Sequence, residues 1–583
     1  MAAIRRLLIA NRGEIAVRVI CACREMDIEA VVAATPGERE AMHAELADGV
    51  VVVGSYLDAA TLVAAAVENG CDAVHPGYGF LSENADFAEK VIGAGVVWVG
   101  PPPDAMRRLG DKVAARHLAE VAGVPVVAGF TGDDLHGRRP HDALTDEALI
   151  AAAADLGPPL IVKAAAGGGG RGMREVHDLA DLPEALTAAR AEAAKAFGDD
   201  AVFLERFLTG ARHIEVQVVL DDHGGAVHLG ERDCSLQRRH QKIVEESPSP
   251  AVDPDLRARL GAAALAVARE AGYRGAGTAE FLLLDDGSWA FLEMNARLQV
   301  EHPVTEAVAG IDLVRAQLTI AAGDPLPWTQ EDVHLAGHAI EARVYAEDPG
   351  AGFLPATGTV DLLDLPRWPG VRIDTALRQG DRVGLGFDPL LAKVIAFAEH
   401  RPACLARLRA ALAETRIVGV TTNLGFLIDA LGHPDVVAGR TGIDWVETVW
   451  HAEPPPLPEG VHALGDPTDP WFAYGPAEQP PGVTVAGRHA LYRGWSYAIS
   501  DDERGAVTLA PAGGSLAAPM PASVERVDVA EGDRVHAGQI ALVLEAMKMY
   551  LPVTVPVDGV VRAVHVRPGD VVAAGQILIE VEE

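Results

Sequence analysis

Two acidic strands joined by a tight turn carry residues suited to binding a metal ion. Glu280 and Glu293 lie in two apolar runs, and Asp285-Asp286-Gly287 between the runs is typical of a β-hairpin turn. Pairing of the strands would place both carboxylates side by side, with Asn295 facing the same way. Without a cation these carboxylates would repel each other, and carboxylate and amide oxygens suit Mg²⁺ that also binds phosphates. The hairpin therefore predicts a metal site at Glu280, Glu293 and Asn295.

A glycine-rich segment at residues 167–172 predicts contact with phosphate groups. A buried-looking strand precedes it and ends in Lys163, which can bridge phosphates as a point charge. Glycines let backbone N–H groups approach phosphate oxygens closely. No Lys-Ser or Lys-Thr pair follows the glycines, so the segment is not a Walker P-loop. It resembles the phosphate-covering loop of ATP-grasp enzymes, and a flexible linker is the alternative.

The polar run 231–242 concentrates four cations and His240 in a chain whose formal net charge is −34. That overall charge disfavours binding to nucleic acid or to an anionic membrane surface. A nucleotide site in such a chain needs its cations gathered locally, as they are here. A solvated face is the alternative interpretation, but the acidic strands downstream favour a binding site.

Lys548, near the C-terminus, lies between two related segments. Residues 532–540 recur as 569–577, and such a repeat indicates two copies of one unit packed together. Lys548 lies at their junction, within Glu-Ala-Met-Lys-Met, where a hairpin turn would expose it. A solvated hairpin lysine is the alternative, but the repeat and the flanking methionines favour a modified residue.

The first hundred residues alternate short strands with helices. Strands are predicted at 5–10, 30–34, 50–53 and 73–75, and helices at 15–26 and 58–68. This alternation predicts a parallel, doubly wound sheet. The loop 75–84 follows a strand at its carboxyl end, where ligands bind in such sheets; a glycine-rich turn is the alternative.

The compartment is predicted from the cysteines and from the apolar runs. The five cysteines form no CxxC pair, which suits a reducing cytoplasm. The apolar run at the N-terminus is too short for a signal peptide. No apolar stretch reaches the about 18 residues that a membrane span needs. We therefore expect a cytoplasmic protein.

Several long motifs resemble one family. Residues 1 to about 445 resemble biotin carboxylase, an ATP-grasp enzyme. The motifs that carry the resemblance are Ile9–Ala16, His75–Asn84, Gly167–Met173, Glu231–Lys242, Glu293–Pro303, Gly337–Arg343 and Phe353–Pro355. Residues 545–549 resemble the attachment motif of biotinyl carrier domains, with Pro519-Met520-Pro521 as its companion element. The whole resembles the α subunit of biotin-dependent acyl-CoA carboxylases, of the actinobacterial acetyl-/propionyl-CoA type.

The resemblance implies a multidomain α/β and α+β fold, an ATP-grasp biotin carboxylase followed by an all-β biotinyl (lipoyl-like) domain. The expected parts are an N-terminal doubly wound α/β domain at 1–111, an ATP-grasp domain at 112–334 with a lid at roughly 131–205, a C-terminal domain at 335–445, a short docking region at 446–512 and the carrier at 513–583. Ala490–Ile499 is a strand candidate in the docking region. The small residues of Ala512–Ala518 predict a linker.

The resemblance also assigns roles to single residues. ATP is expected at Lys112, Lys163, Gly167, Gly168, Gly169, Gly170, Gly172, Met173, Glu205, Leu208, His213, Gln237, His240 and Leu282. Bicarbonate is expected at Lys242, Arg297, Gln299, Val300 and Glu301. Glu280, Glu293 and Asn295 are expected to hold Mg²⁺ or Mn²⁺, and Tyr78 and Arg343 to contact biotin. A biotin protein ligase is expected to biotinylate Lys548.

The implied chemistry is ATP-dependent carboxylation of biotin by bicarbonate, with carboxyphosphate as the activated form. Phosphoryl transfer of this kind needs positioning and charge neutralisation. Glu301 is expected to act as general base, while Arg297 and Lys242 hold the bicarbonate oxygens. Arg343 is expected to stabilise the biotin enolate as a fixed cation. A surface salt bridge between Arg297 and Glu301 is the alternative.

No segment resembles a carboxyltransferase, so the resemblance implies a separate β subunit that carboxylates an acyl-CoA. It also implies a homo-oligomer within a larger α/β complex. The alternatives are a subunit of a methylcrotonyl-CoA or other carboxylase, an ATP-grasp ligase, and a biotin-presenting scaffold without activity. The carrier repeat argues against the ligase, and the full set of site residues argues against the scaffold. The sequence leaves the acyl-CoA open.

Overall fold

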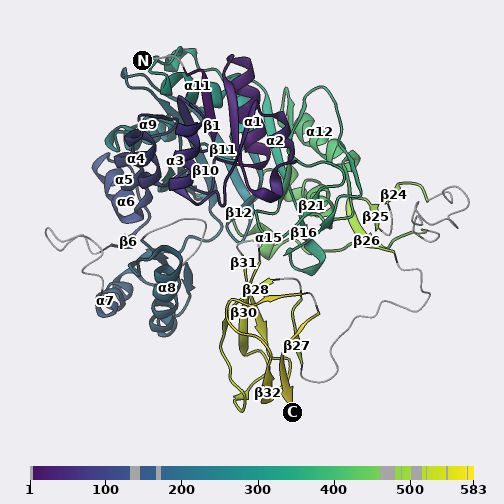
Figure 1. Ribbon diagram of the computed structural model, residues 1–583. Coiled ribbons are helices and arrows are strands. Elements are labelled where there is room, and N and C mark those ends of the chain that lie inside the picture. Colours follow the sequence, from purple (N-terminus) through teal and green to yellow (C-terminus); the bar gives the residue numbers. More distant parts are fainter. Residues whose placement is uncertain are drawn as a thin grey trace, which may run out of the picture.

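The chain folds into a large body, a lid and a carrier (Figure 1). The computed structural model describes residues 4–131, 145–165, 173–458, 461, 480–486, 489–499, 515–519, 522–546, 549–573 and 575–582, with the backbone alone at 196, 197, 546, 549 and 550. Among these residues, every helix is too short or too polar to cross a bilayer.

A parallel five-stranded sheet opens the chain, in the order β3-β2-β1-β4-β5. Its strands are β1 (Arg6–Ile9), β2 (Glu29–Ala34), β3 (Gly49–Val52), β4 (Ala73–His75) and β5 (Val97–Trp98). The helices of this part are α1 (Gly13–Glu25), α2 (Met42–Leu46), α3 (Ala59–Glu68), α4 (Ala85–Gly93) and α5 (Pro103–Gly110). Leu8 joins one hydrophobic core, whereas Leu7 and Ile9 join another. Both faces of β1 are therefore buried, and the predicted parallel sheet is confirmed.

The lid is a small antiparallel sheet covered by two helices. Its strands, in the order β6-β9-β7-β8, are β6 (Gly129–Phe130), β9 (Val202–Arg206), β7 (Leu160–Ala164) and β8 (Arg174–Val176). The helices are α7 (Asp146–Leu156) and α8 (Leu182–Phe197), and Figure 1 shows them below the body. Val162, Leu186 and Phe203 share one hydrophobic core, which Val113 from outside the lid also joins. The lid is therefore built around this core and packs against the body at Val113.

An eight-stranded antiparallel sheet forms the centre of the body, in the order β14-β13-β10-β11-β12-β15-β22-β20. Its strands are β10 (Arg212–Leu220), β11 (Ala226–Arg238), β12 (Gln241–Ser247), β13 (Gly275–Leu283), β14 (Trp289–Asn295), β15 (His338–Tyr345), β20 (Val371–Thr375) and β22 (Leu390–Ala398). The helices beside it are α6 (Lys112–Val121), α9 (Pro254–Glu270), α10 (His302–Ala309) and α11 (Leu313–Ala321). Because β12 pairs with β15, the sheet is continuous across residue 335.

The rest of the body packs on one end of this sheet. Its helices are α12 (Arg401–Glu414), α13 (Leu424–Ala430), α14 (Pro434–Val437) and α15 (Trp445–Thr448). Its short strands are β16 (Glu347–Asp348), β17 (Leu354–Pro355), β18 (Gly358–Thr359), β19 (Leu362–Asp364), β21 (Arg382–Val383) and β23 (Arg416–Val418). Phe353, Phe426 and Trp445 share a core with residues of β15 and β22.

A three-stranded sheet of β24 (Val483–Ala486), β25 (His489–Tyr492) and β26 (Trp495–Ala498) follows. The single strand candidate Ala490–Ile499 was therefore wrong, since the chain reverses at Arg493-Gly494. Both turn residues have positive φ, +51° and +84°, which suits a tight hairpin turn. The buried Trp495 lies against Gly425 of α13, where a Cβ atom would meet the indole ring at 2.6 Å. This contact anchors the sheet to the body.

The carrier is two four-stranded sheets with matching order, β27-β34-β32-β29 and β31-β30-β28-β33. The first-copy strands are β27 (Leu516–Ala517), β28 (Ala522–Val527), β29 (Arg534–Val535) and β30 (Ile540–Ala546). The second-copy strands are β31 (Met549–Thr554), β32 (Gly559–Val564), β33 (Val571–Val572) and β34 (Ile577–Glu582). Each sheet takes strands from both copies, so the predicted packing of two copies is confirmed.

The beginning of the carrier corrects one prediction made from composition. Leu516 and Ala518 were expected to end a linker, but both are buried in the carrier core, and Leu516 pairs with Ile579 of β34. Small residues suit a flexible linker, but pairing with β34 and burial in the core make this stretch the first strand of the carrier.

Candidate active site

The predicted metal-binding hairpin forms at one edge of the central sheet. Glu280 on β13 lies directly opposite Glu293 on β14, and the amide of Asn295 donates to Glu280 Oε1 at 2.9 Å. The predicted pairing of the two carboxylates is therefore confirmed. Lys112 Nζ lies 2.8 Å from Glu293 and supplies a positive charge there.

Lys242, at the start of β12, lies in a buried cluster of carboxylates. Its Nζ donates to Glu280 at 2.8 Å and to Glu301 at 2.7 Å, and it also pairs with Glu215. Burial opposes the charge, but the three carboxylates hold the pKa of Lys242 well above its ordinary value. Burial likewise opposes ionisation of Glu280, whereas Lys242 and His213 hold the pKa of that carboxyl well below its ordinary value. Lys242 and Glu280 are therefore both charged at neutral pH.

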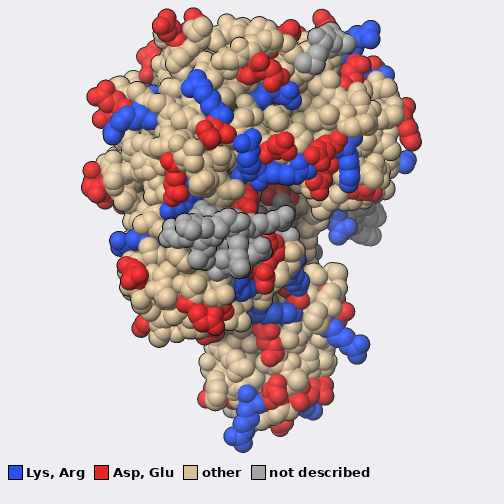
Figure 2. Space-filling view, turned by 90° about the vertical axis from the view of Figure 1, so that its left-hand side faces the viewer, with Lys and Arg blue, Asp and Glu red and all other residues tan. Residues whose placement is uncertain are grey.

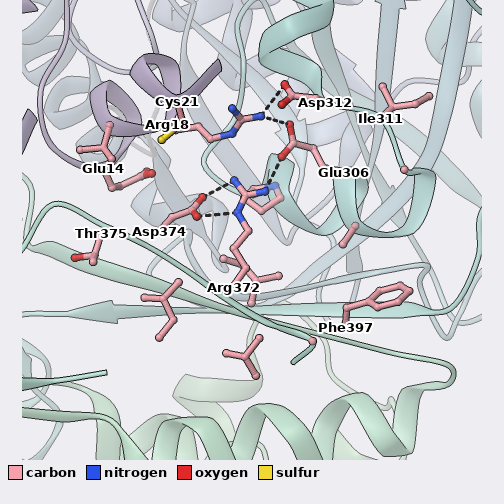
Figure 3. A pocket seen from close by; sticks show the side chains of 18 of the residues that line it. Glu14, Arg18, Cys21, Glu306, Ile311, Asp312, Arg372, Asp374, Thr375 and Phe397 are labelled. Atoms are coloured by element: carbon pink, nitrogen blue, oxygen red, sulfur yellow. Dashed lines mark hydrogen bonds and ion pairs between the residues drawn. The ribbon is translucent and has the colours of Figure 1, made fainter. Parts of the chain in front are cut away.

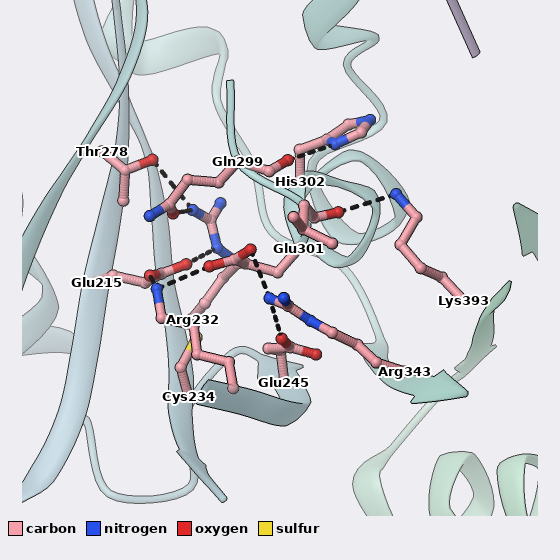
Figure 4. A network of polar contacts seen from close by, with 12 residues as sticks. Glu215, Arg232, Cys234, Glu245, Thr278, Gln299, Glu301, His302, Arg343 and Lys393 are labelled. Carbon is pink, nitrogen blue, oxygen red and sulfur yellow. Dashed lines mark hydrogen bonds and ion pairs between the residues drawn. The ribbon is translucent and has the colours of Figure 1, made fainter. Parts of the chain in front are cut away.

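Glu301 lies between two cations. Arg343 Nη2 is 2.8 Å from one carboxylate oxygen of Glu301 (Figure 4). Lys242 binds the other oxygen. Burial opposes ionisation of Glu301, but Lys242, Arg343 and Arg232 outweigh it and hold its pKa well below the ordinary value. This carboxylate, only 2% exposed, is therefore ionised and able to accept a proton.

A second carboxylate, Glu245 on β12, binds the same guanidinium, 2.5 Å from Arg343 Nη2. Burial raises the pKa of Glu245 to about 7, although Arg343 opposes the shift. Glu341 lies directly opposite Glu245 on β15, and both residues are fully buried. Burial raises the pKa of Glu341 well above its ordinary value. Glu245 and Glu341 therefore form a pair of buried carboxyl groups, and Glu245 contacts the Arg343 guanidinium.

Two buried side chains hold the backbone on each side of Val300. Lys393 Nζ donates to the Val300 carbonyl at 2.9 Å and pairs with Glu14 at 3.1 Å. His302 Nδ1 lies 2.7 Å from the Gln299 carbonyl (Figure 4). Burial keeps the pKa of His302 well below its ordinary value, so the ring is neutral and its Nδ1–H donates. The two peptide planes that flank Val300 are thus fixed.

Sequence reasoning missed Glu215 and Arg232, which connect these groups. Arg232 is fully buried, pairs with Glu215, and donates to Gln299 and Thr278 at 2.8 and 3.1 Å (Figure 4). Glu215 lies directly opposite Glu280, and with His213 and Glu280 it forms a group that could hold a metal ion. The alternation of β10 puts Glu215 on the same face as His213, and that signal was available in the sequence.

Arg297 and Gln299 contribute at the edge of the cluster. Arg297 pairs with Glu83 at 3.0 Å and donates to the Asn295 side chain at 3.1 Å. Gln299 donates to Glu280 at 2.8 Å. Glu301 binds Lys242 and Arg343 and not Arg297, so the simple salt bridge considered from the sequence is not the arrangement found.

The residues predicted to bind ATP lie around the lid and the β11–β12 turn. Lys163 on β7 pairs with Glu205 on β9 at 2.5 Å, and His213 lies 3.1 Å from Glu280. His240 stands in the turn with a φ of +64°, next to Arg239 at +47°. Of the other described candidates, Met173 precedes β8, Leu208 follows β9, Gln237 lies on β11, and Leu282 lies on β13 directly opposite His213.

Two predicted sites, the glycine-rich loop and the biotin attachment lysine, lie outside the residues that the structure describes, whereas Tyr78 lies within them. Gly167, Gly168, Gly169, Gly170, Gly172 and Lys548 lie outside the described residues. On either side of Lys548 the strands β30 and β31 pair, with Ala546 opposite Met549, as a hairpin requires. Tyr78 is half-buried, and its ring centre lies 6.0 Å from Lys393 Nζ, whose strand neighbour is Arg343.

A cavity of about 620 Å³ lies beside α10 but holds none of the predicted site residues. Arg18 pairs with Glu306 and Asp312, and Arg372 pairs with Glu306 and Asp374 (Figure 3). These side chains pair with one another, and Glu14 in the cavity wall is connected to the cluster around Glu301 through Lys393.

Family models match most of the chain. "Biotin carboxylase, N-terminal domain" matches residues 3–106, and "Carbamoyl-phosphate synthase L chain, ATP binding domain" matches 111–329. "Biotin carboxylase C-terminal domain" matches 341–448, and "Biotin-requiring enzyme" matches 514–581.

Individual relatives extend this likeness. The biotin-dependent acyl-coenzyme A carboxylase alpha3 subunit of Mycobacterium leprae is 40% identical over 586 residues, which cover 96% of this chain and 95% of that protein. The mitochondrial methylcrotonoyl-CoA carboxylase subunit alpha of Rattus norvegicus is 45% identical over 450 residues, which are 76% of this chain and 62% of that protein. The chain thus spans less than two thirds of the length of the rat relative.

A solved structure with the same fold is the biotin carboxylase domain dimer of the Hydrogenobacter thermophilus 2-oxoglutarate carboxylase, in complex with MgADP, ADP and bicarbonate. It is 39% identical, with a TM-score of 0.74, and covers 77% of this chain and 98% of its own. The mixed α/β fold with a C-terminal biotinyl β domain is therefore established. The chain belongs to the biotin-dependent carboxylase family, as a biotin carboxylase joined to a biotin carrier domain.

Proposed function

We propose that the chain uses ATP and bicarbonate to carboxylate the biotin carried on its own Lys548. The observation that carries the proposal is the ionised Glu301 between Lys242 and Arg343, beside the paired carboxylates Glu280 and Glu293. A base, two cations and a set of metal-binding oxygens thus meet within one buried cluster. This combination suits proton removal from a small oxyanion and phosphoryl transfer to it.

The donor set near Glu280 fits a hard divalent cation such as Mg²⁺ or Mn²⁺. Carboxylates and an amide oxygen are the ligands such ions prefer, and Glu215, Glu280, Glu293 and Asn295 offer them. The bound ion would supply charge neutralisation for the phosphates of ATP. Lys112 and Lys163 now pair with Glu293 and Glu205, so both lysines are positioned to exchange a carboxylate for a phosphate oxygen.

Arg297, Gln299 and the Val300 backbone would hold bicarbonate next to Glu301. Glu301 accepts the bicarbonate proton as the oxygen attacks the γ-phosphorus. If Lys242 and Arg343 turn toward the substrates, Glu301 loses two cations, its pKa rises, and it becomes a stronger base. Arg343 would then face the ureido oxygen of biotin, with Tyr78 beside it. Biotin would supply the ureido nitrogen, which loses its proton to the phosphate released from carboxyphosphate and forms a bond to the CO₂ released with it.

We further propose that a separate carboxyltransferase β subunit passes the carboxyl group to acetyl-CoA, propionyl-CoA or a longer acyl-CoA, as in the actinobacterial type. The near-complete coverage of the Mycobacterium leprae α subunit favours this choice over a methylcrotonyl-CoA enzyme. The proposed divisions are 1–111, 112–334, 335–445, 446–512 and 513–583. Turnover of a panel of acyl-CoAs by the complex with its co-purified β subunit tests the choice, and exclusive use of methylcrotonyl-CoA would contradict it.

Replacement of the base tests the reaction itself. Glu301→Gln should lower carboxylation of free biotin by about 100-fold or more, because a general base contributes at least this factor, while KM for ATP changes little. Bicarbonate-dependent release of phosphate and ¹⁴C-carboxybiotin are the measurements. Lys548→Ala is the matched control: it should lose the biotin mass increment and keep wild-type turnover of free biotin. Near-wild-type turnover by Glu301→Gln would show that another group is the base.

A further inference from the structure

The carrier touches the rest of the chain through a small set of side chains. Leu354 on β17 and Leu385 pack against the hydrophobic core of the carrier. Lys195, near the end of the lid helix α8, forms an ion pair with Glu525 on β28. In Figures 1 and 2 the carrier forms the lower end of the molecule, with the lid and the body above it.

Leu354 lies close in the fold to the cation predicted to meet biotin. It pairs with Asp348 on β16, and the neighbouring Glu347 binds Arg238 at 2.7 Å. Two residues before Glu347, the hydroxyl of Tyr345 accepts a hydrogen bond from Arg343 at 3.3 Å. A carrier that packs on Leu354 is therefore held at the part of the body that presents Arg343.

Leu385 lies close to the other predicted biotin contact. It is two residues from Phe387, whose ring centre is 6.4 Å from that of Phe80 in an edge-to-face arrangement. Phe80 belongs to the same loop as Tyr78, and Arg12 stacks on Phe387 with its Cζ 3.8 Å from the ring centre. Each leucine is thus connected, through neighbouring residues, to one of the two predicted biotin contacts.

Lys195 adds the lid to this arrangement. Its side chain is 62% exposed and that of Glu525 is 19% exposed. Exposed ion pairs contribute little stability, and two half-buried leucines add a limited apolar contact. A weak contact suits a carrier that must also leave for a second active site.

We propose that Leu354, Leu385 and Lys195 form a seat on which the chain's own carrier docks for carboxylation of its biotin. The seat contacts the carrier from two sides, through Lys195 of the lid and through the two leucines of the body. This inference rests on the proposed function, since it assigns the place where the carrier meets the biotin carboxylase part.

Reversal of the ion pair tests the seat. Lys195→Glu and Glu525→Lys should each slow single-turnover transfer of ¹⁴C-bicarbonate to the chain's own biotin by about 3- to 10-fold, because like charges then face each other. The double variant should recover to within about 2-fold of the wild type, since the pair is restored with its signs exchanged. Free biotin should be carboxylated at the wild-type rate by all three. Intact mass shows that each chain is fully biotinylated before the assay.

Two matched controls separate the seat from general charge effects. Arg526→Glu changes the neighbouring carrier residue, which pairs with Asp528 within the carrier, and Glu184→Lys changes an exposed residue at the other end of α8. Neither should alter transfer to the chain's own biotin. Leu385→Ser should slow that transfer and leave free-biotin turnover unchanged.

Several outcomes would overturn the seat. These are single variants with wild-type transfer, a double variant no faster than the singles, and an equal loss of free-biotin turnover in the variants. If the wild type itself fails to carboxylate free biotin, the proposed function fails and not the seat alone.

Discussion

Val300 shows how a residue can be positioned entirely by buried neighbours. Lys393 binds its carbonyl, and the carbonyl of Gln299 before it accepts from His302. Because each peptide is planar, a fixed carbonyl also fixes the direction of the N–H in the same plane. The Val300 N–H, predicted to bind bicarbonate, is therefore aimed by His302, and Lys393 holds the next peptide.

Replacement of Lys393 should weaken bicarbonate binding selectively. Lys393→Met should raise KM for bicarbonate by about 10-fold with KM for ATP unchanged. The peptide after Val300 is then no longer held, and the looser backbone weakens the predicted hydrogen bond from the Val300 N–H to the anion, which is worth roughly this much. Removal of the lysine also leaves Glu14 buried without its partner, so Lys393→Met combined with Glu14→Gln is the variant that keeps the fold. Steady-state kinetics at varied bicarbonate measure the effect. Equal changes in both KM values would point to a general loss of structure.

Glu245 predicts a pH dependence of stability. Burial raises its pKa from 4.5 to about 7. Between these two pH values Glu245 is mostly protonated in the folded state and mostly ionised in the unfolded chain. This contribution to stability is fully present below pH 4.5 and is lost as the pH rises through about 7. Glu245→Gln removes the titration, so the melting temperature of the wild type should fall relative to that of the variant as the pH rises from about 5 to 8. A parallel pH profile for both proteins would contradict the assignment.

Contacts of the site could be predicted from the sequence where the residues lie close together along the chain, and not where they lie far apart. The pairing of Glu280 with Glu293 was predicted because one short turn joins their strands. Glu245 and Glu341 are 96 residues apart, and Lys393 reaches Val300 from a strand 93 residues later. No local pattern predicts such contacts, because they depend on the strand order of the sheet.

At the scale of elements, the β11–β12 hairpin contains the most unusual backbone of the site. Arg239 and His240 both have positive φ, a conformation in which a Cβ atom is crowded. The turn nevertheless lets β11 and β12 pair closely, with Arg238 opposite Gln241. The positive φ of His240 is unfavourable for a residue with a Cβ atom, and the pairing of β11 with β12 maintains it.

Arg239 allows this strain to be measured without touching a predicted ligand. Arg239→Gly should leave stability unchanged or raise it by up to about 1 kcal/mol, whereas Arg239→Val should lower it by about 1–2 kcal/mol. Urea unfolding of the two variants gives the difference. Equal stability of the glycine and valine variants would show that the turn relaxes without cost.

The elements that local patterns predicted well were those with strong periodicity. The parallel strands around β1 formed close to the predicted bounds, because continuous apolar runs fit a sheet buried on both faces. The errors came where composition replaced pattern, at the Arg493-Gly494 reversal and at Leu516. The first stretch contains a hairpin turn at Gly494 and is two strands instead of one. The second contains Leu516, which packs in the carrier core.

At the scale of the whole molecule, one sheet joins parts that sequence comparison treats as separate. β12 and β15 pair across residue 335, and Glu245 and Glu341 lie on this seam. Figure 2 shows acidic and basic side chains interspersed over one face of the molecule.

A fragment of residues 1–334 should therefore not fold alone. It would lose β15, β22 and β20 and leave the edge of β12 unpaired, which favours aggregation. Coexpression with residues 335–583 should restore a soluble, co-purifying pair. Gel filtration and circular dichroism of the two preparations are the measurements, and a monomeric, cooperatively unfolding 1–334 fragment would contradict the prediction.

The exchanged strands of the carrier have a consequence for its possible origin. The backbone N–H of Gly532 binds Val561 of the other copy, and that of Gly569 binds Val524 in return. Each half thus completes the sheet of the other, and neither has a closed core by itself. A polypeptide with one half could bury its apolar residues only as a two-fold symmetric dimer. The carrier is equivalent to such a dimer whose two halves are joined into one chain. In the sequence, Lys548 lies where the first half meets the second.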